Sequence, residues 1–264
     1  MLIKILRPFL GRKCLFPIYN AMYKLSLRGM NIGLGDDVRF SGEKNVLSYV
    51  KKHSIKRGEG KLIVFDVGAN KGQYTNTILN FFNDNYIEIH CFEPGHETFR
   101  ELSDDVGRNS NVTLNNFGLS DSQTEGILYF DEAGSGLASL YKRQLDYFDI
   151  NFEKSESVSL DTLDNYVKTK NIEAIDLLKL DVEGNELNVL NGSTKTLAQG
   201  KIKAIQIEFG GCNIDSRTFI RDFWNLLHEN FIMYRIMKDG LIEIKKYQET
   251  LEIFSCTNFF FAKR

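Results

Sequence analysis

The sequence predicts an α/β protein with a mostly parallel β-sheet that is covered by helices on both faces. The first observation is an unbroken apolar run at residues 62–65, which is typical of a strand buried on both sides. The second is the polar segment 66–72, which contains two glycines and leads into a helical pattern over residues 74–82. The third is that strand-like and helix-like segments alternate to the end of the chain, as crossover helices between parallel strands require.

The same patterns indicate where the other elements lie. After the first strand, further strands are expected at residues 86–92, 112–117, 174–180, 204–209, 231–237 and 257–262, with an extra extended piece at 127–130. Helices between them are indicated by apolar residues at helical spacing, for example Phe99, Leu102 and Val106. The last two strands, separated by a loop region with Gly240, are expected to be antiparallel. Residues 134–141 contain two glycines and are expected to form either a mobile lid or an ordinary long loop.

Length and composition are those of an ordinary soluble globular protein. The 264 residues are 42% hydrophobic and 26% charged, which suits one α/β domain with a small appendage. A net charge of −2 gives no general attraction to nucleic acid, so no nucleic-acid partner is predicted. The cysteines, Cys14, Cys91, Cys212 and Cys256, form no CxxC pair. We interpret them as reduced packing residues of a cytoplasmic protein rather than as a zinc site.

The N-terminal segment has no acidic residue before Asp36 but carries several basic ones. Apolar residues at positions 15, 18, 19, 22 and 25 have the spacing of an amphipathic helix, and no run approaches the roughly 18 apolar residues of a membrane span. We expect this helix to pack on the main domain. The alternatives are a peripheral contact of residues 1–30 with an anionic membrane, at its inner face, or a contact between subunits of an oligomer whose size the sequence does not indicate.

The sequence divides into a helical appendage and a main domain. A polar connection follows the N-terminal segment and contains one short helix around residues 46–50. We place the boundary near residues 58–60, so that residues 1–60 form the appendage and residues 61–264 form the domain that holds the sheet.

Acidic residues stand at the predicted carboxyl ends of four strands. Asp66 follows the first strand and Glu93 follows the second. Asp181 and Glu183 follow the fourth strand, and Glu208 lies near the end of the strand after that. Carboxylates at such positions must be solvated, hydrogen-bonded or paired with a ligand, because burying them unpaired is costly. Open α/β sheets bind their ligands at this edge, and we therefore expect the functional site here.

The glycine turn and Glu93 together indicate a nucleoside cofactor. Gly68 and Gly72 permit a tight turn and the close approach of a ligand to a helix N-terminus. Glu93 lies 25 residues after Gly68, where a carboxylate can accept two hydrogen bonds from a ribose diol. The turn lacks the second glycine of G-x-G-x-x-G, which favours a cofactor without a pyrophosphate. The structural alternatives are a turn that binds nothing and an acid that only stabilises the next helix.

The ordered set of motifs resembles the FkbM-type methyltransferases. The matching segments are residues 66–74 (DVGANKGQY), 93–94 (EP), 119–121 (LSD), 159–163 (SLDTL) and 178–186 (LKLDVEGNE). The resemblance runs from about residue 62 to the C-terminus. It implies a class I, Rossmann-like fold with seven strands, of which the last is antiparallel. It also implies an S-adenosylmethionine-dependent enzyme that methylates a hydroxyl of a sugar, a glycan or a related natural product.

Carried over by position, the resemblance implies roles for individual residues. Those expected around the methionine part of the cofactor belong to the glycine turn: Asp66, Gly68, Asn70, Gly72 and Tyr74. Glu93 would bind the ribose hydroxyls, and Leu119 and Ser120 would flank the adenine. Asp181 would lie near the methionine amine and the transferred methyl, and Glu183 and Glu208 would face the acceptor.

The expected chemistry needs a group that takes a proton from the acceptor hydroxyl, which is a poor nucleophile at neutral pH. Glu183 is the first candidate for this base, followed by Asp181 and Glu208; the structural alternative for Glu183 is a cap on the following helix. No metal is assigned, although a divalent ion held by the three carboxylates is a further alternative. Two other classes stay open: an NAD-dependent oxidoreductase acting on a sugar nucleotide, which the missing glycine disfavours, and a catalytically silent binding module.

Overall fold

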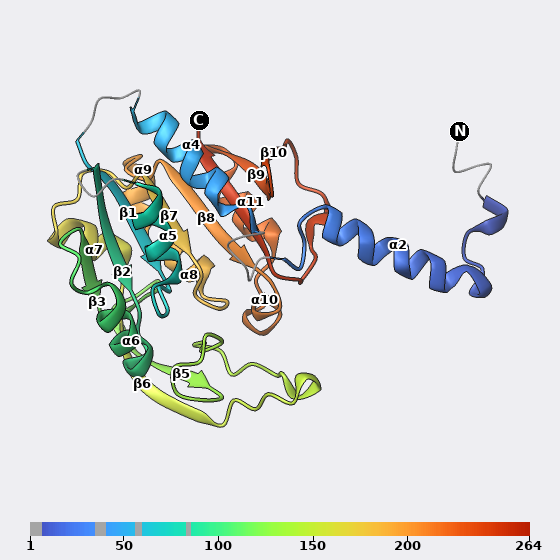
Figure 1. The fold of residues 1–264 in the computed structure, drawn as a ribbon, viewed down its shortest axis with the longest axis horizontal. Coiled ribbons are helices and arrows are strands. Elements are labelled where there is room, and N and C mark those ends of the chain that lie inside the picture. Colours follow the sequence, from blue (N-terminus) through green and yellow to red (C-terminus); the bar gives the residue numbers. More distant parts are fainter. Residues whose placement is uncertain (1–6, 35–40, 56–59, 83–85) are drawn as a thin grey trace.

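The computed structural model describes residues 7–34, 41–55, 60–82 and 86–264 (Figure 1). Its centre is a sheet in the order β10-β9-β11-β8-β7-β1-β2-β3. The strands of this sheet are β1 (Leu62–Val67), β2 (Ile87–Phe92), β3 (Val112–Asn115), β7 (Leu177–Leu180), β8 (Ala204–Phe209), β9 (Phe231–Met237), β10 (Gly240–Ile244) and β11 (Thr257–Lys263). The chain runs from β1 outward to β3, then returns to β7 on the other side of β1, so the strand order reverses between β1 and β7.

The expected mostly parallel sheet is confirmed, but it has eight strands rather than seven. β1 pairs in parallel with β2 and β7, β2 with β3, and β7 with β8. The last strand, β11, is antiparallel to both of its neighbours, β8 and β9, as predicted. The additional strand is β10, which forms an antiparallel hairpin with β9 at the edge of the sheet. Gly240, expected in a loop, is the first residue of β10. None of the residues of β10 is fully buried, so this strand has little of the apolar pattern that marks a core strand.

Helices cover both faces of this sheet, as the alternating pattern predicts. The α-helices of the described residues are α2 (Phe16–Gly29), which lies apart from the sheet, and α4 (Glu43–Ile55), α5 (Gln73–Phe81), α6 (His96–Val106), α7 (Leu163–Thr169), α8 (Glu186–Asn191), α9 (Thr194–Ala198), α10 (Cys212–Ser216) and α11 (Ile220–Leu227). Short 3-10 turns are η1 (Arg7–Phe9), η2 (Lys13–Leu15), η4 (Asp146–Phe148) and η5 (Glu249–Leu251). One hydrophobic core joins the sheet to α4, α5 and α6, and a second joins it to α7, α8 and α11.

A second, three-stranded sheet in the order β4-β6-β5 lies next to the carboxyl ends of the main strands (Figure 1). It consists of β4 (Gly118–Leu119), β5 (Thr124–Phe130) and β6 (Lys154–Asp161). The strand expected at 127–130 is thus the end of a longer one, and the strand expected at 112–117 stops at Asn115. β6 was not expected, because polar residues occupy most of its positions and only Val158 and Leu160 are buried in it.

The helix expected around residues 46–50 is α4, and it packs deep in the main core. Val46 is fully buried and Val50 is 2% exposed, in the same core cluster as β1 and β2. The predicted boundary near residue 58 falls on residues 56–59, which lie outside the described part of the chain. The division at residue 60 stays a prediction, but α4, on its N-terminal side, is structurally part of the sheet's covering layer.

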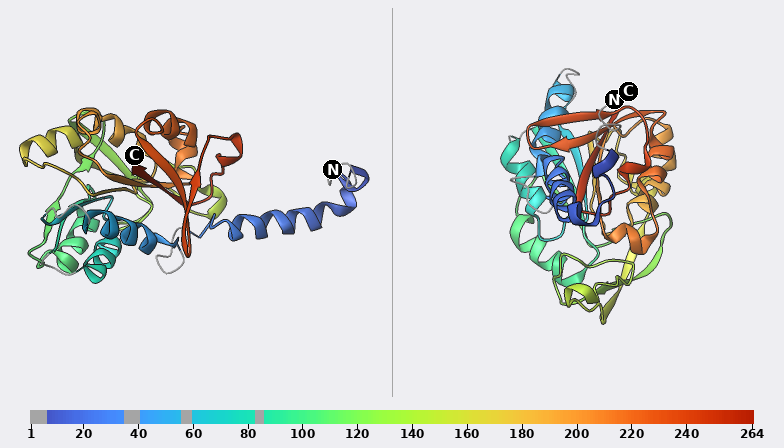
Figure 2. Two further views of the ribbon diagram at one scale, coloured as in Figure 1. Left: turned by 90° about the horizontal axis from the view of Figure 1, so that it is seen from above. Right: turned by 90° about the vertical axis from the view of Figure 1, so that its right-hand side faces the viewer.

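Helix α2 does not pack on the domain as expected but projects away from it (Figure 2). None of its residues is buried. The turn after it is fixed to the domain: the side chain of Asn31 donates to the carbonyls of Ser41 and Ile236, at 2.8 and 3.1 Å. The backbone N–H of Gly33 donates to the carbonyl of Cys256. Within the described residues, no helix is both long enough and apolar enough to cross a bilayer.

Candidate active site

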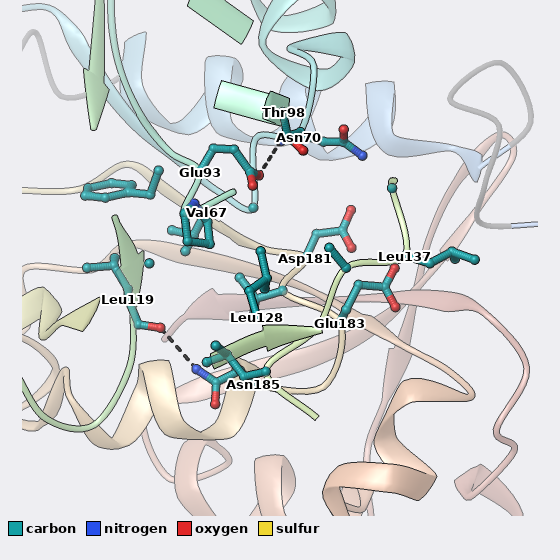
Figure 3. Close-up of a pocket in the computed structure, with 18 of the residues that line it drawn as sticks. Val67, Asn70, Glu93, Thr98, Leu119, Leu128, Leu137, Asp181, Glu183 and Asn185 are labelled. Carbon is teal, nitrogen blue, oxygen red and sulfur yellow. Dashed lines mark hydrogen bonds between the residues drawn. The ribbon is translucent and has the colours of Figure 1, made fainter. Parts of the chain in front are cut away.

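A cavity of about 370 Å³ opens at the carboxyl ends of the central strands (Figure 3). Its lining includes Val67 at the end of β1, Phe92 at the end of β2, Asp181 directly after β7 and Glu208 in β8. This is the edge at which the strand order reverses, where open α/β sheets bind ligands. The cavity therefore lies where the sequence places the functional site.

One side of the cavity, which we call the glycine-turn wall, is formed by Gly68, Asn70, Glu93 and Leu119. Gly68 has a φ of +79°, and a Cβ there would stand 1.8 Å from the backbone oxygen of Asp181, so only glycine fits. The side-chain oxygen of Asn70 is buried and has no hydrogen-bond partner among the described residues. An unsatisfied acceptor in a cavity is a ready partner for a ligand N–H group.

Glu93 is held by backbone donors from both sides. Its Oε2 accepts from the N–H of Asn70 and its Oε1 from the N–H of Gly95, each at 3.0 Å. Burial raises the pKa of this carboxyl to about 7, although the two backbone hydrogen bonds act to lower it. The bond to Gly95 also means that Glu93 fixes the start of α6. Stabilising this helix and accepting hydrogen bonds from a ligand are therefore compatible tasks for the same side chain. Each oxygen keeps a lone pair that can accept from a ligand.

The end of the cavity next to Leu119 is apolar. Leu119 is 1% exposed, and Leu128 of β5 and Leu160 of β6 line the cavity with it. The side chain of Asn185 donates to the carbonyl of Leu119, at 3.1 Å, which attaches this wall to the start of α8. Ser120, expected to flank the adenine, is not among the described residues that line the cavity, and its Oγ accepts from the same Asn185 amide at 3.3 Å.

Three further residues of the predicted cofactor set lie behind the wall rather than in it. Asp66 is completely buried and accepts a 2.7 Å hydrogen bond from the hydroxyl of Thr75. Tyr74 points into the core, where its hydroxyl donates to the side chain of Gln206. Gly72, with a φ of +90°, shapes the start of α5. These residues support the turn, because the helix that follows it carries Tyr74 and Thr75 inward.

A buried lysine connects the layer behind the wall to the cavity. Lys179 Nζ lies 2.9 Å from Asp181 Oδ2 and 3.9 Å from Asp66 Oδ1. The neighbouring strand contributes Gln206, whose amide donates to the carboxylate of Glu43 in α4, at 2.7 Å. The pKa of Lys179 is raised, because these carboxylates outweigh the burial of its ammonium. Lys179 thereby fixes the orientation of Asp181 at the mouth of the site.

The opposite side of the cavity, which we call the acidic wall, consists of Asp181, Glu183 and Glu208. All three predicted catalytic residues therefore line one space. Glu183 has a φ of +51°, a backbone conformation that non-glycine residues adopt only at a cost. Glu186, rather than Glu183, accepts the hydrogen bonds of the backbone N–H groups of Val182 and Gly184. This arrangement leaves the Glu183 carboxylate directed to other partners.

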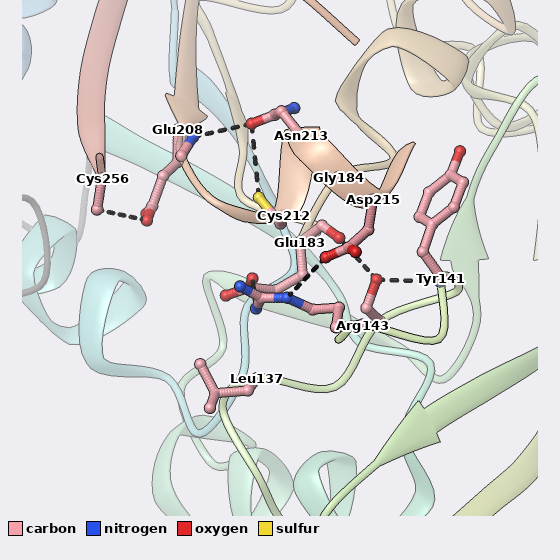
Figure 4. Close-up of polar contacts among 12 residues, drawn as sticks. Leu137, Tyr141, Arg143, Glu183, Gly184, Glu208, Cys212, Asn213, Asp215 and Cys256 are labelled. Atoms are coloured by element: carbon pink, nitrogen blue, oxygen red, sulfur yellow. Dashed lines mark hydrogen bonds and ion pairs between the residues drawn. The ribbon is translucent and has the colours of Figure 1, made fainter. Parts of the chain in front are cut away.

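The partner that Glu183 meets is an arginine from the loop between β5 and β6 (Figure 4). Arg143 Nη1 lies 2.6 Å from Glu183 Oε2, and Arg143 Nε lies 3.8 Å from Asp215 Oδ2. The side chain of Arg143 is only 8% exposed. The hydroxyl of Ser139 donates to the backbone carbonyl of Glu183, at 2.7 Å. The loop is thus attached to the acidic wall through one ion pair and one neutral hydrogen bond.

Glu208 has a different environment from Glu183. Its carboxyl lies between the sheet and the cavity, and Cys256 Sγ donates to its Oε1 at 2.7 Å. Burial, followed by the nearby charge of Asp181, raises the pKa of Glu208 well above its ordinary value. Glu208 therefore holds its proton far more readily than an exposed glutamate. The wall combines an ion-paired carboxylate with one that favours the neutral form.

The loop expected as a lid covers the cavity between the two walls. Within residues 134–141 the cavity is lined by Ser135, Gly136, Leu137, Ala138 and Leu140. Gly136 passes directly over the side chain of Asn70, since a Cβ on it would lie 3.0 Å from Asn70 Nδ2. At its other end, the hydroxyl of Tyr141 accepts from the side chain of Asn188 in α8, at 3.1 Å. The loop is a cover over this site and not an ordinary surface connection.

Residues of the site that sequence reasoning missed include Leu128, Leu160, Asn185 and Arg143. Leu128 and Leu160 belong to the small sheet, whose strands alternate too weakly to be recognised in full. Asn185 lies inside the LKLDVEGNE motif, but its contact with Leu119 is visible only in the fold. Arg143 lies 40 residues before Glu183, and no spacing rule connects them. Among the described residues, no three His, Cys, Asp or Glu side chains converge as metal ligands.

In a comparison with protein families, the model described as "Methyltransferase FkbM domain" aligns with residues 66–232. Two curated relatives are each 25% identical to the chain. The hexuronic acid methyltransferase AglP of Haloferax volcanii aligns over 173 residues, 64% of this chain and 64% of that protein. The 2-O-methyltransferase NoeI of Sinorhizobium fredii aligns over 147 residues, 52% of this chain and 59% of that protein. The chain thus matches less than two thirds of either relative.

Solved structures with a similar fold include a methyltransferase FkbM from Methylobacillus flagellatus, with 14% identity and a TM-score of 0.46 over 76% of this chain and 43% of that one. Another is the fibrillarin of Aeropyrum pernix with natively bound S-adenosyl-L-methionine, with 12% identity and a TM-score of 0.40 over 77% of this chain and 67% of that one. The family match covers more than half of the chain and includes both walls of the cavity. The protein belongs to the FkbM methyltransferase family.

Proposed function

We propose that this protein transfers a methyl group from S-adenosylmethionine to a hydroxyl of a sugar, a glycan or a related natural product. The observation that carries the proposal is one cavity with two unlike walls. The glycine-turn wall offers a ribose-binding carboxylate and an apolar end, and the acidic wall offers carboxylates suited to a reacting hydroxyl. The volume of about 370 Å³ is within the usual range for small-molecule sites, which is roughly 300–1,000 Å³.

The residues of the glycine-turn wall fit the proposed cofactor. Glu93 would accept the two ribose hydroxyls, since each of its oxygens keeps a lone pair beside its backbone donor. The unsatisfied oxygen of Asn70 would accept from the methionine amine, and Gly68 would let the ligand approach the backbone. Leu119 would pack on the adenine. When bound, S-adenosylmethionine supplies a methyl group on a positively charged sulfur.

The two carboxylates that face the acceptor would have different tasks. Glu183 would accept the proton of the acceptor hydroxyl, and Arg143 would hold its carboxylate in place at 2.6 Å. Glu208, which favours its protonated form, would donate a hydrogen bond to an acceptor oxygen. Asp181, oriented by Lys179, would stand between the cofactor and the acceptor. The proposal assigns the proton transfer to these side chains and no task to a metal ion.

A sugar or glycan acceptor is supported by the printed names of the two relatives, a hexuronic acid methyltransferase and a 2-O-methyltransferase. Polar side chains that line the cavity, among them Ser135 and Asn185, suit an acceptor with several hydroxyls. We propose that the enzyme acts in the cytoplasm. We propose that the chain divides into a helical segment, residues 1–60, and a catalytic domain, residues 61–264.

Calorimetric titration with S-adenosylmethionine, S-adenosylhomocysteine and NAD tests this proposal. We expect both sulfur nucleosides to bind and NAD not to bind. Substitution Glu93→Ala should raise the dissociation constant at least about tenfold, because hydrogen bonds to a charged acceptor are worth roughly 1.5–3 kcal/mol each. Glu229→Ala, which removes an exposed glutamate after α11, should leave the affinity unchanged.

The outcomes separate the alternatives. A preference for NAD would replace methyl transfer by hydride transfer. Binding of no cofactor, by a chain that still unfolds cooperatively, would indicate a silent module. Unchanged affinity in Glu93→Ala would remove this carboxylate from the ribose site while leaving the cofactor assignment in place. Turnover is then measured with free and lipid-linked uronic acids and hexoses as acceptors.

A further inference from the structure

Helix α2 exposes an unusually large apolar surface for a part of a soluble domain. Leu25 is 72% exposed, Phe16 is 66% exposed and Met22 is 56% exposed. The turns before the helix add Phe9 and Leu10, both of them exposed. Contiguous exposed apolar surface of this kind marks a contact site for a protein or a membrane.

The charged residues of α2 lie with Asn20 on one narrow stripe, and Ser26 is the single hydroxyl-bearing serine on the opposite side. Asn20, Lys24 and Arg28 follow one another at intervals of four residues, which places them on one side of the helix. The remaining circumference is mainly apolar or aromatic, with Met22 near its middle. The aromatic residues on it include Tyr19 and Tyr23, and tyrosine is enriched where an apolar phase meets water.

The helix is a fixed projection rather than a loose tail. Asn31, directly after it, is 8% exposed and donates from its side chain to two backbone carbonyls of the domain. Ile32 is 2% exposed, and the backbone N–H of Gly33 donates to the carbonyl of Cys256, just before β11. The base of α2 is therefore part of the folded domain, and the helix is presented away from it (Figure 2).

The charges on this segment select the kind of partner. The described residues 7–34 contain Arg7, Arg12, Lys13, Lys24 and Arg28 and no acidic residue. A helix of 14 residues is about 21 Å long, too short for the roughly 30 Å hydrocarbon core of a bilayer. We propose that the segment 7–30 docks the enzyme on an anionic lipid bilayer, with α2 lying in the plane of the interface. Its apolar face would enter the acyl boundary, and its basic side chains would reach the lipid phosphates.

A second copy of the chain is a poorer partner for this surface. Two copies of the segment 7–34 packed on each other would bring together ten basic side chains and no acidic residue. A bilayer that contains anionic lipid supplies the missing negative charge and takes up the apolar face at the same time. Charge complementarity therefore favours the lipid surface.

Flotation of the full-length chain with vesicles of two compositions tests the proposal. We expect binding to equimolar phosphatidylcholine–phosphatidylglycerol vesicles and much weaker binding to phosphatidylcholine alone. Met22→Glu combined with Leu25→Glu should abolish binding. Lys24→Gln and Arg28→Gln should each weaken binding to the anionic vesicles about fivefold, since one basic residue near such a surface contributes about 1 kcal/mol. Glu229→Gln on the domain is the matched control and should not change binding.

The orientation of the helix gives a second, independent measurement. In Met22→Trp, the fluorescence emission of the new indole should shift to the blue on addition of anionic vesicles. In Lys24→Trp, whose side chain lies on the polar stripe, the emission should shift much less. The substituted residues lie outside the cavity, so the affinity for S-adenosylmethionine should stay the same. Unchanged affinity shows that the domain of each variant is folded.

Two results would overturn the proposal. One is equal binding of the wild type and the Met22→Glu, Leu25→Glu variant to anionic vesicles. The other is a wild type that does not bind vesicles, that light scattering shows to be a dimer, and that becomes a monomer when it carries the same double substitution. The second result would assign the surface to self-association.

Discussion

The two walls of the cavity are built in different ways. The glycine-turn wall consists largely of backbone at the ends of β1 and β2, and Glu93 is fixed there by two backbone N–H groups. The acidic wall consists of side chains, and it holds Glu183 through Arg143, which comes from a loop outside the main sheet. The proposed cofactor side is thus determined by strand geometry, and the proposed acceptor side by a contact between distant segments.

This difference teaches which wall can vary. The turn around Gly68 leaves no space for a Cβ, so its conformation is set by the packing of β1 against β7. A loop attached through Arg143 and Ser139 can change in sequence without disturbing the sheet. A fold that keeps one cofactor and changes its acceptors needs this division, because function resides in the site and not in the fold.

The largest effect is expected on the acidic wall. Glu183→Gln keeps the shape of the side chain but removes the proposed base, and general base catalysis typically contributes 10²–10⁴-fold to a rate. We expect kcat to fall by about this factor on an identified acceptor, while the affinity for S-adenosylmethionine changes little. Steady-state kinetics and calorimetry on the same preparation measure the two quantities.

Glu208→Gln is the matched comparison for that experiment. An amide resembles the protonated carboxyl that burial favours at this position, so this variant should keep most of the wild-type kcat. A large loss in Glu208→Gln together with a near-normal Glu183→Gln would exchange the two assignments. Normal turnover in both would remove carboxylate bases from the mechanism.

The next effect concerns the backbone of the glycine-turn wall. In Gly68→Ala, the new methyl group would collide with the backbone oxygen of Asp181 at a φ of +79°. We expect a loss of at least about 4 kcal/mol in the free energy of unfolding, which is the range of the largest single-substitution effects. Gly60→Ala is the control, because a Cβ there meets no atom within 4 Å. Urea denaturation of both variants gives the difference, and equal stability would show that the turn can rearrange.

The sequence predicts the glycine-turn wall better than the acidic wall, for a physical reason. A buried strand, a glycine turn and an acid at the next strand end are local patterns, and parallel pairing brings their ends together wherever β1 and β2 are adjacent. Gly68 and Glu93 could therefore be placed at this wall from spacing alone, whereas Asn70 was placed there by the family resemblance. Tyr74 could not be placed correctly, because a helix presents its residues to several sides and this one faces the core beside Gln206.

The acidic wall was predicted in its residues but not in its contacts. Strand ends identify Asp181, Glu183 and Glu208, whereas the partner of Glu183 depends on how the loop between β5 and β6 returns across the cavity. β6 is too polar to be recognised from its pattern, so the path of that loop, and with it the position of Arg143, follows only from the three-dimensional structure. The exposed position of α2 is a similar case, because its apolar face alone suggested packing on the domain.

The smallest of these effects concerns the pH dependence of cofactor binding at the glycine-turn wall. Burial raises the pKa of Glu93 from 4.5 to about 7, so between these values the folded protein keeps a proton that the unfolded chain has lost. The contribution of Glu93 to stability therefore falls as the pH rises through this window. A ribose diol donates to the ionised carboxylate and stabilises it, so ligand affinity should change in the opposite direction and rise with pH.

From one pH unit below 7 to one unit above, the ionised fraction of Glu93 increases about tenfold, and the apparent affinity should follow. The probe should be 5′-methylthioadenosine, because the amine of S-adenosylmethionine titrates near the same pH. Glu186 has a pKa raised to a similar value, but it does not line the cavity, so it should affect stability and not ligand affinity. Glu93→Ala should bind weakly with little pH dependence. If the affinity of the wild type did not change with pH, Glu93 would not contact the ribose. The geometry of the glycine-turn wall would then not be evidence for a nucleoside site.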